Sequence, residues 1–246
     1  MPGMTDAHVH MGCLFAKGEF PVDYATVLTV AKCKDALMAG FTTFRDAGSV
    51  SEGLKLAFDE GVLPGPRIYP CGAYISQTCG HGDSEYAHTY RDIQYRHPSS
   101  TVLADGVPEI IRAVREQFYR GASHIKLMAT EILNRHEDIR LLFGTDMMIT
   151  GPDYQVEQSE DIRYYEKRFG TMRALRALTG TANEVFALTT YQNPYPKGKI
   201  GVLEAGAFAD LLLVDGDPTK RVSVLADTDH LRLIMKGGTV YKNTLC

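Results

Sequence analysis

The sequence predicts an α/β fold in which parallel strands alternate with helices, followed by a small all-β segment. Three observations lead to this prediction. Strand-like and helix-like segments alternate along residues 1–195, which is typical of a parallel sheet with crossover helices. After Pro196, glycines separate short β-prone runs, which favours a second, smaller sheet. The chain of 246 residues is 44% hydrophobic with a formal net charge of −4, so we expect a folded core.

The first part of the chain predicts two strands, each followed by a helix. Met4–His10 is expected to form the first strand, and Asp23 is placed to cap a helix that continues to about residue 39. Gly40 ends that helix, and the β-prone run Phe41–Asp46 predicts the second strand. A short helix is expected over residues 51–61.

The middle of the chain is less regular. Residues 67–74 predict a third strand, and residues 75–104 form a long polar and aromatic stretch typical of a functional or mobile loop. Asp105 is expected to cap a helix that Gly121 ends. One face of that helix carries the apolar residues Ile110, Ile111, Val114 and Phe118.

The remaining elements complete an expected division into two domains. Residues 123–129 and 141–146 predict a fourth and a fifth strand, and Thr171 is expected to cap a further helix. We therefore expect a partial β/α domain over residues 1–195 and part of a small β-domain over residues 196–246. The short strands of the second domain are expected over residues 210–214, 231–235 and 239–241.

Composition and motif searches exclude several functional classes. Thirty acidic residues outnumber 26 basic ones and no basic block occurs, which argues against nucleic-acid binding. No apolar run approaches the ~18 residues of a membrane span. Five scattered cysteines without a CxxC pair, and the absence of an export signal at the start, predict a cytoplasmic protein with reduced thiols. Gly-x-Ser-x-Gly, phosphate-loop and dinucleotide motifs are absent from the sequence.

The clearest chemical motif is His8-Val9-His10 at the end of the first strand. Residues two apart on a strand point the same way, and the carboxyl ends of parallel strands are where α/β folds place their sites. Two neighbouring imidazoles suit a divalent metal such as zinc. The alternative is two unrelated polar residues at a strand end.

Lys126 and Asp146 are the next candidates. Lys126 interrupts an apolar strand, where a buried ammonium needs a partner, a lowered pKa or a modification. Asp146 ends the apolar run 141–145, and a carboxylate there can ligate a metal or accept a proton from water. The alternatives are a lysine that extends its ammonium to solvent and an aspartate that caps a turn.

His81 lies between two glycines, in a segment that suits close approach of the backbone to a ligand. A surface turn is the alternative interpretation. The remaining histidines without a partner pattern are expected to be structural; they are His88, His97, His136 and His230.

Together these segments resemble the metal-dependent amidohydrolase superfamily. The resemblance is carried by four ordered motifs, residues 2–10, 40–46, 125–129 and 144–146, and by the tail segments 198–211 and 236–240. Residues 65–83 are similar to the imidazolonepropionase-related, prolidase-like branch, which includes ochratoxinase-type carboxypeptidases. The resemblance implies a TIM-barrel-derived α/β fold with a small C-terminal sheet segment.

The family mechanism assigns a role to each matching residue. The resemblance implies that His8 and His10 hold one metal ion, that a carbamylated Lys126 bridges to a second, and that Asp146 is both ligand and general base. One or two divalent ions, zinc by preference, would then activate water against an amide bond. The implied substrate is an N-acyl amino acid or a dipeptide, whose carboxylate His81 or Arg45 is expected to meet. For Arg45, a structural ion pair is the alternative.

The sequence also departs from the family pattern. About five barrel strands are expected instead of eight, and the two further metal-binding histidines on the family's fifth and sixth strands have no counterpart. An open barrel exposes strand edges, which leaves a homo-oligomer as one way to complete it. The competing hypothesis is therefore a catalytically impaired, truncated family fragment that binds one metal weakly or none.

Overall fold

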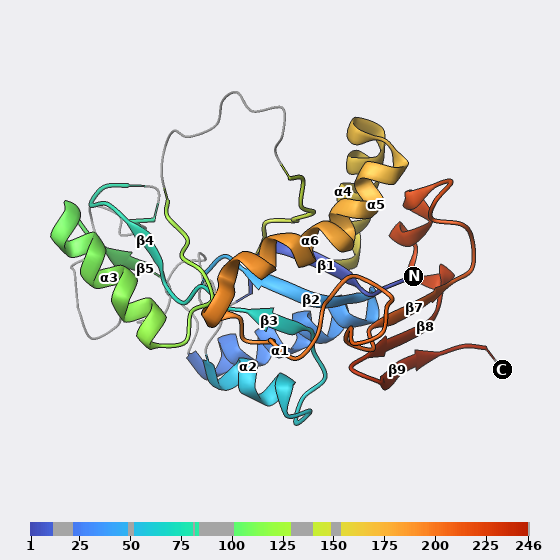
Figure 1. Ribbon diagram of the computed structural model, residues 1–246, viewed down its shortest axis with the longest axis horizontal. Helices are drawn as coiled ribbons and strands as arrows, with labels where there is room; N and C mark the ends of the chain where they lie inside the picture. The colour runs from blue at the N-terminus through green and yellow to red at the C-terminus, as the bar shows by residue number, and fades with distance from the viewer. Residues whose placement is uncertain are drawn as a thin grey trace.

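The computed structural model describes residues 1–11, 22–48, 52–80, 82–83, 101–128, 140–148 and 154–245 (Figure 1). The strands are β1 Met4–His10, β2 Phe41–Asp46, β3 Arg67–Tyr69, β4 Tyr74–Ser76, β5 Thr101–Leu103, β6 Met147–Met148, β7 Leu211–Val214, β8 Leu231–Lys236 and β9 Thr239–Asn243. The α-helices are α1 Val22–Met38, α2 Glu52–Asp59, α3 Val107–Tyr119, α4 Tyr154–Phe169, α5 Thr171–Leu178 and α6 Gly180–Phe186. Three short 3-10 helices are η1 Ala187–Gln192, η2 Val222–Ala226 and η3 Thr228–His230.

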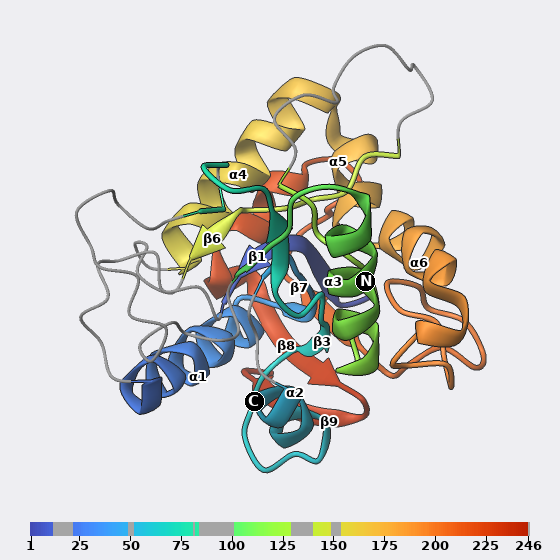
Figure 2. The same cartoon turned by 90° about the vertical axis from the view of Figure 1, so that its left-hand side faces the viewer.

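The central sheet has four parallel strands in the order β3-β2-β1-β6. Helices α1, α2 and α4 pack on one face, where Phe44 and Ile68 belong to a core shared with Leu37 and Ile162. Helix α6 packs on the other face, where Phe186 meets Tyr69. Figure 2 shows these helices arranged around β1. Because helices cover both faces, β1 and β2 are buried along almost their whole length, as expected for parallel strands.

A second parallel sheet is formed by β4 and β5. The segment before Lys126 joins it by a bridge between Ile75 and Leu127, with Ile75 N donating to the Lys126 carbonyl at 2.9 Å. Six parallel strands in two sheets, with helices packed against them, make an incomplete β/α barrel in the described part of the chain. This confirms the fold class predicted from the sequence.

Three expected strands differ in detail. The run 67–74 is split into β3 and β4, because Gly72 has φ 70° and Gln117 Oε1 accepts from the Ala73 amide at 2.8 Å, which turns the chain out of the sheet. Residues 123–128 form only the bridge at Leu127, and the expected strand 141–146 is reduced to β6, one residue further on. Two of the three therefore lie beside the sheets as extended segments with isolated hydrogen bonds.

Helix α3 also differs from its prediction. Gly106 precedes its first turn, and Asp105 instead accepts hydrogen bonds from Thr78. Ile110 and Ile111 are 36% and 43% exposed, whereas Val114 and Phe118 are half-buried, so only part of the expected apolar face is covered. Its buried residues are Ala113, which belongs to the same cluster as Ile75 of β4, and Gln117, whose Oε1 accepts from the Ala73 amide.

The C-terminal segment forms the antiparallel sheet β7-β8-β9, close to the expected strand positions. A buried ion pair between Arg67 and Asp210 fixes this sheet to β3, and Lys236 Nζ donates to the Gly65 carbonyl at 2.6 Å. The boundary near residue 195 remains a prediction. Every helix in the described residues is too short or too polar to cross a membrane.

Candidate metal centre

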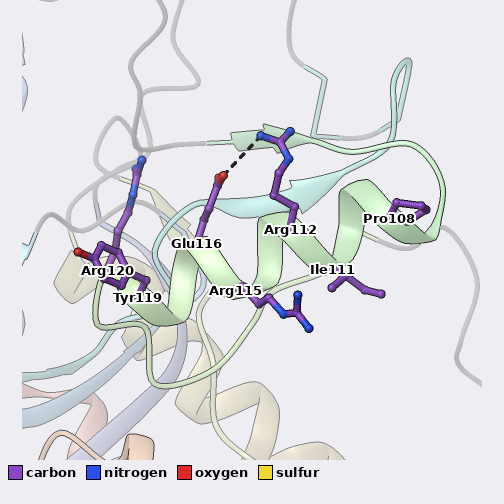
Figure 3. A pocket seen from close by; sticks show the side chains of 7 residues that line it. All are labelled: Pro108, Ile111, Arg112, Arg115, Glu116, Tyr119 and Arg120. Carbon is purple, nitrogen blue, oxygen red and sulfur yellow. Dashed lines mark hydrogen bonds and ion pairs between the residues drawn. The ribbon is translucent and has the colours of Figure 1, made fainter.

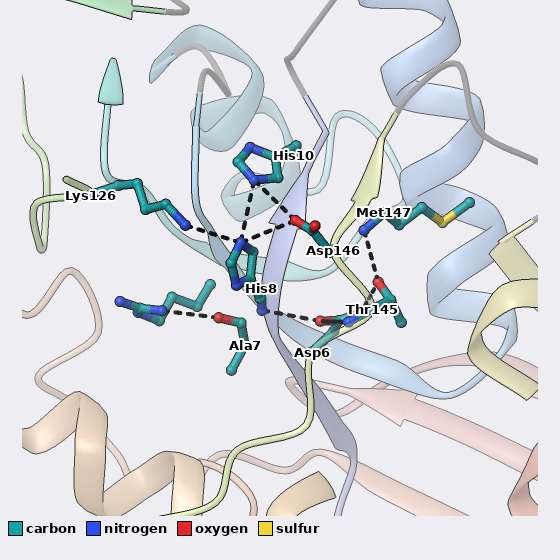
Figure 4. Close-up of polar contacts among 9 residues, drawn as sticks. Asp6, Ala7, His8, His10, Lys126, Thr145, Asp146 and Met147 are labelled. Carbon is teal, nitrogen blue, oxygen red and sulfur yellow. Dashed lines mark hydrogen bonds and ion pairs between the residues drawn. The ribbon is translucent and has the colours of Figure 1, made fainter. Parts of the chain in front are cut away.

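Three of the predicted site residues converge at the carboxyl end of β1 (Figure 4). His8 Nε2 and His10 Nε2 are 3.3 Å apart, and Asp146 Oδ1 lies 3.1 Å from the first and 3.3 Å from the second. The alternation of a strand brings the two imidazoles together, and the parallel pairing of β1 with β6 brings Asp146 beside them. His10 is buried, whereas the Asp146 side chain is 71% exposed, so the centre opens to solvent on the carboxylate side.

The spacing of these atoms fits a divalent ion. Four ligands at the ~2.0–2.1 Å distances of zinc bonds lie about 3.3 Å from one another in a tetrahedron. The three observed separations, 3.1, 3.3 and 3.3 Å, match that edge length. Two imidazole nitrogens and one carboxylate oxygen are also a ligand set that zinc accepts, with a fourth position left for water or substrate. Within the described residues, these three form the one group of three or more potential ligands.

Lys126 reaches the same centre from the segment beside β4. Its Nζ lies 3.2 Å from His8 Nε2, so the prediction that it points into the cleft agrees with its position. Burial lowers the pKa of its ammonium, and the charge of Asp146 opposes that effect. Lys126 thus adds a fourth group to the centre, as an amine that approaches an imidazole.

A buried hydrogen-bond network supports the centre from behind. Asp6 Oδ1 accepts from the amides of His8 at 3.1 Å and Thr145 at 3.2 Å. Asp6 Oδ2 accepts from Thr145 Oγ1 at 2.7 Å and from Tyr154 Oη at 3.0 Å. One fully buried carboxylate therefore ties β1, the turn before Asp146 and helix α4 together. Burial raises the pKa of Asp6 to about 7, although all four hydrogen bonds oppose the rise.

Asp146 adopts an unusual backbone conformation in this arrangement. Its φ is 57°, in the left-handed region that non-glycine residues seldom occupy. Its amide donates to the His8 carbonyl at 2.8 Å, and the Thr145 contacts to Asp6 hold the preceding residue. Hydrogen bonds from His10 and His8 hold the pKa of the Asp146 carboxyl well below its usual range. The carboxylate is therefore ionised and aimed at the imidazoles.

Sequence reasoning missed Asp6, Thr145 and Tyr154 as members of the site. Asp6 carried a detectable signal, because an acid inside a strand that is otherwise buried needs hydrogen-bond donors. Tyr154 had no such signal, since it lies on a helix that the sequence did not predict.

The two predicted substrate-binding residues have different outcomes. His81 lies outside the described residues. Arg45 lies on β2 and donates to the carbonyl of Ala7, the residue before His8, at 3.1 Å. Their substrate-binding roles remain predictions.

Two cavities in the described part of the structure lie away from the candidate metal centre, because neither is lined by His8, His10, Lys126 or Asp146. The larger, about 520 Å³, follows the outer surface of α3, where Arg112 pairs with Glu116 at 3.4 Å (Figure 3). All its lining residues come from that helix and the residue after it, so we interpret it as a surface groove. The second, about 380 Å³, includes Arg45.

Comparison with known proteins identifies the relatives of this chain. The amidohydrolase family profile matches residues 1–138. Ochratoxinase from Aspergillus niger is 34% identical over 150 residues, which cover 53% of this chain and 31% of the relative. The chain thus spans about a third of the length of the curated relatives it matches.

Solved structures show the same fold. An amidohydrolase superposes with a TM-score of 0.83 at 22% identity, covering 100% of this chain and 87% of that one. The A. niger ochratoxinase structure gives a TM-score of 0.76 at 20% identity, covering 99% and 83%. A prolidase complexed with N-methylphosphonate-L-proline gives 0.76 at 20% identity, covering 99% and 86%. With more than half of its residues matched by the family profile and this barrel-derived fold, the chain belongs to the amidohydrolase family.

Proposed function

We propose that the protein is a metal-dependent hydrolase of carbon–nitrogen bonds that cleaves the amide of an N-acyl amino acid or a dipeptide. The observation that carries the proposal is the triangle of His8 Nε2, His10 Nε2 and Asp146 Oδ1, with edges of 3.1 to 3.3 Å. Those separations support one divalent ion, with zinc as the first choice.

His8, His10 and Asp146 are the residues that would hold the ion. A divalent ion supplies Lewis acidity, which activates water and polarises an amide carbonyl. Asp146 is the proposed general base: one of its oxygens faces the imidazoles, and its exposed, ionised carboxylate is free to accept a proton from water. Asp6 holds the backbone of His8 and of Thr145, so both sides of the triangle keep their positions without reorganisation.

Lys126 has the more specific proposed role of a carbamylated bridge to a second ion. Its Nζ lies 3.2 Å from His8 Nε2, which supports a place beside the first ion. Burial favours the neutral amine, the form that reacts with carbon dioxide. A second ion would need further ligands, and the described residues offer no second group of three.

The substrate class is proposed from the relatives. The curated relative is an ochratoxinase, and the solved structures include a prolidase and a Xaa-Pro dipeptidase. From these relatives we propose for this protein a carboxypeptidase-like or prolidase-like activity, which cleaves an amide next to a carboxylate. A small-molecule amide or dipeptide is the expected partner.

The impaired fragment is the second candidate, favoured by one specific observation. Among the described residues, the centre offers three ligand atoms and Lys126, whereas two ions held firmly need more. Under this alternative the protein binds one ion weakly and turns over slowly or not at all.

The experiment that separates the two candidates is a turnover assay with zinc-loaded protein. A panel of N-acyl amino acids and dipeptides is incubated with the wild type and with Asp146→Asn, which keeps the side-chain shape and removes the base. The proposal expects turnover that Asp146→Asn lowers by about 100-fold or more. Equal rates in both proteins would refute the role of Asp146, and no turnover with weakly bound zinc would favour the impaired fragment.

A further inference from the structure

The cavity of about 380 Å³ shares no lining residue with the candidate metal centre, and its lining includes one cationic side chain, Arg45. It lies between β3, the segment before Lys126, and the chain from the end of α6 through η1. Its volume of about 380 Å³ falls within the roughly 300–1,000 Å³ of small-molecule sites. We call this space the Arg45 pocket, after the one charged side chain in its lining; burial lowers the pKa of the lining residue His124 to about 3, so its imidazole is neutral.

The Arg45 guanidinium is incompletely paired. Among the described residues it has a single hydrogen-bond acceptor, the Ala7 carbonyl at 3.1 Å, and it forms no ion pair. No aspartate or glutamate lines the pocket. Asp46, the next residue on β2, is fully buried and acts on Arg45 only as a nearby charge. A guanidinium has five donors in a planar fork, so most of its donors are left for a ligand.

The pocket has an aromatic wall. Tyr69 and Phe186 form its buried base, since they are 2% and 3% exposed and their ring centroids lie 4.1 Å apart. Phe118 of α3 is half-buried and Tyr191 is 90% exposed, and both line the same space. These two rings leave surface for an apolar or aromatic ligand body.

The lining of the pocket also includes polar side chains and one strained residue. Thr189, Thr190 and Gln192 of η1 are among the lining residues. Thr190 has φ 49° and ψ −119°, which is costly for a β-branched residue. These residues add hydrogen-bonding groups to the pocket without adding a charge.

We propose that the Arg45 pocket binds a small monocarboxylate with an aromatic or branched apolar body. One guanidinium fork matches one carboxylate, because the two N–H groups and the two oxygens pair in a plane. The aromatic wall receives the body of the ligand, and the pocket has no acid that would repel its charge. Both products of hydrolysis of an N-acyl amino acid are carboxylates. Only the identification of the ligand with such a product rests on the proposed function; binding itself requires no metal ion.

The test uses the full chain, freed of metal with a chelator, and benzoate as the probe. The protein has no tryptophan, so Leu188→Trp places a single fluorophore at the pocket wall, at a position that is 68% exposed. We expect a saturable fluorescence change with a dissociation constant below about 10 mM, and at least about tenfold weaker binding of benzamide, which has the ring without the charge. Leu203→Trp, 57% exposed and outside the pocket lining, is expected to show no change.

Three variants in the Leu188→Trp background assign the binding to Arg45. Arg45→Met is expected to weaken benzoate at least about tenfold, and Arg45→Lys, which keeps the charge, is expected to weaken it less. Arg112→Met removes an exposed arginine of α3 and is expected to leave binding unchanged. If circular dichroism shows that Arg45→Met does not fold, the ratio of the benzoate and benzamide dissociation constants and the affinity of Arg45→Lys for benzoate test the role of Arg45 instead.

Several results would overturn the proposal. Benzamide binding as tightly as benzoate, no saturation below about 10 mM, or an unchanged constant in both Arg45 variants would each do so. Asp146→Asn in the same background separates this inference from the proposed function, because it is expected to lower turnover by about 100-fold or more and leave benzoate binding intact. Loss of benzoate binding in Asp146→Asn would assign the ligand to the candidate metal centre instead.

Discussion

Removing the hydroxyl of Tyr154 is expected to destabilise the protein by an amount that depends on pH. Tyr154 Oη donates to Asp6 Oδ2 at 3.0 Å, and both residues are fully buried. Tyr154→Phe deletes this donor and changes little else. The pKa of Asp6 is about 7 in the fold against an ordinary value of 3.8, so Asp6 keeps its proton in the fold over a range in which the unfolded chain has lost it.

The magnitude follows from the charge state of Asp6. The raised pKa of Asp6 contributes about 4 kcal/mol to the free energy of unfolding. This contribution is fully present below about pH 4 and is lost as the pH rises through about 7. Below about pH 5 the Tyr154 hydroxyl meets a neutral acid, and its loss is expected to cost about 0.5–1.5 kcal/mol. Near pH 8.5 it meets a carboxylate, and its loss is expected to cost about 1.5–3 kcal/mol.

Urea unfolding of metal-free protein at about pH 5 and about pH 8.5 measures both values. Tyr165→Phe is the matched control, because its hydroxyl lies on the same helix and donates to the uncharged Leu142 carbonyl at 3.1 Å. We expect the control to cost about 0.5–1.5 kcal/mol at both pH values. The reasoning is refuted if Tyr154→Phe costs the same at both pH values, or no more than Tyr165→Phe near pH 8.5.

Three further changes test the fold. Arg67→Met leaves the buried carboxylate of Asp210 without its cation and is expected to lower the free energy of unfolding in urea by about 3–5 kcal/mol. Lys199→Met, which removes the exposed pair with Glu204, is expected to lower it by less than about 1 kcal/mol, and equal losses would contradict this. Burial lowers the pKa of Lys236 from 10.5 to about 8, so the unfolded chain binds more protons and stability rises from about pH 8 to about pH 10. Lys236→Met is expected to flatten that rise, and an unchanged slope would exclude Lys236 as its source. Gly40→Ala puts a side chain on a residue with φ +89°, a conformation that strains any residue but glycine, and is expected to lower the midpoint of urea unfolding. An unchanged midpoint would contradict this expectation.

The first two strands were predicted with their correct bounds because local signals coincide there. Met4–His10 and Phe41–Asp46 are β-prone, and Gly40 ends the helix between them with φ 89°. The run 141–146 has equally apolar residues but forms no regular strand. Gly144 packs so closely against β1 that a Cβ there would lie 2.7 Å from His8 Cβ, and Asp146 turns into the left-handed region. Such close approach depends on tertiary packing, which local pattern does not encode.

Helix α4 was missed because its buried face is narrow and partly polar. Among the helix residues whose burial is described, Tyr154, Gln158 and Ile162 are fully buried and spaced by four, and a glutamine in the middle obscures the apolar period. The convergence of His8, His10 and Asp146 could be predicted, since strand alternation and the shared carboxyl end of parallel strands require no long-range detail.

The metal stoichiometry of the purified protein tests the central claim most directly. Chelated protein is titrated with zinc, and bound metal is counted in the wild type, in His10→Ala and in His230→Ala, a control histidine whose Nδ1 lies 2.6 Å from the Asp215 carbonyl. We expect one tightly bound equivalent of zinc in the wild type and in His230→Ala, and at least about 100-fold weaker binding in His10→Ala. Equal zinc binding in all three proteins, or none in the wild type, would contradict the assignment of His8, His10 and Asp146 as the metal centre.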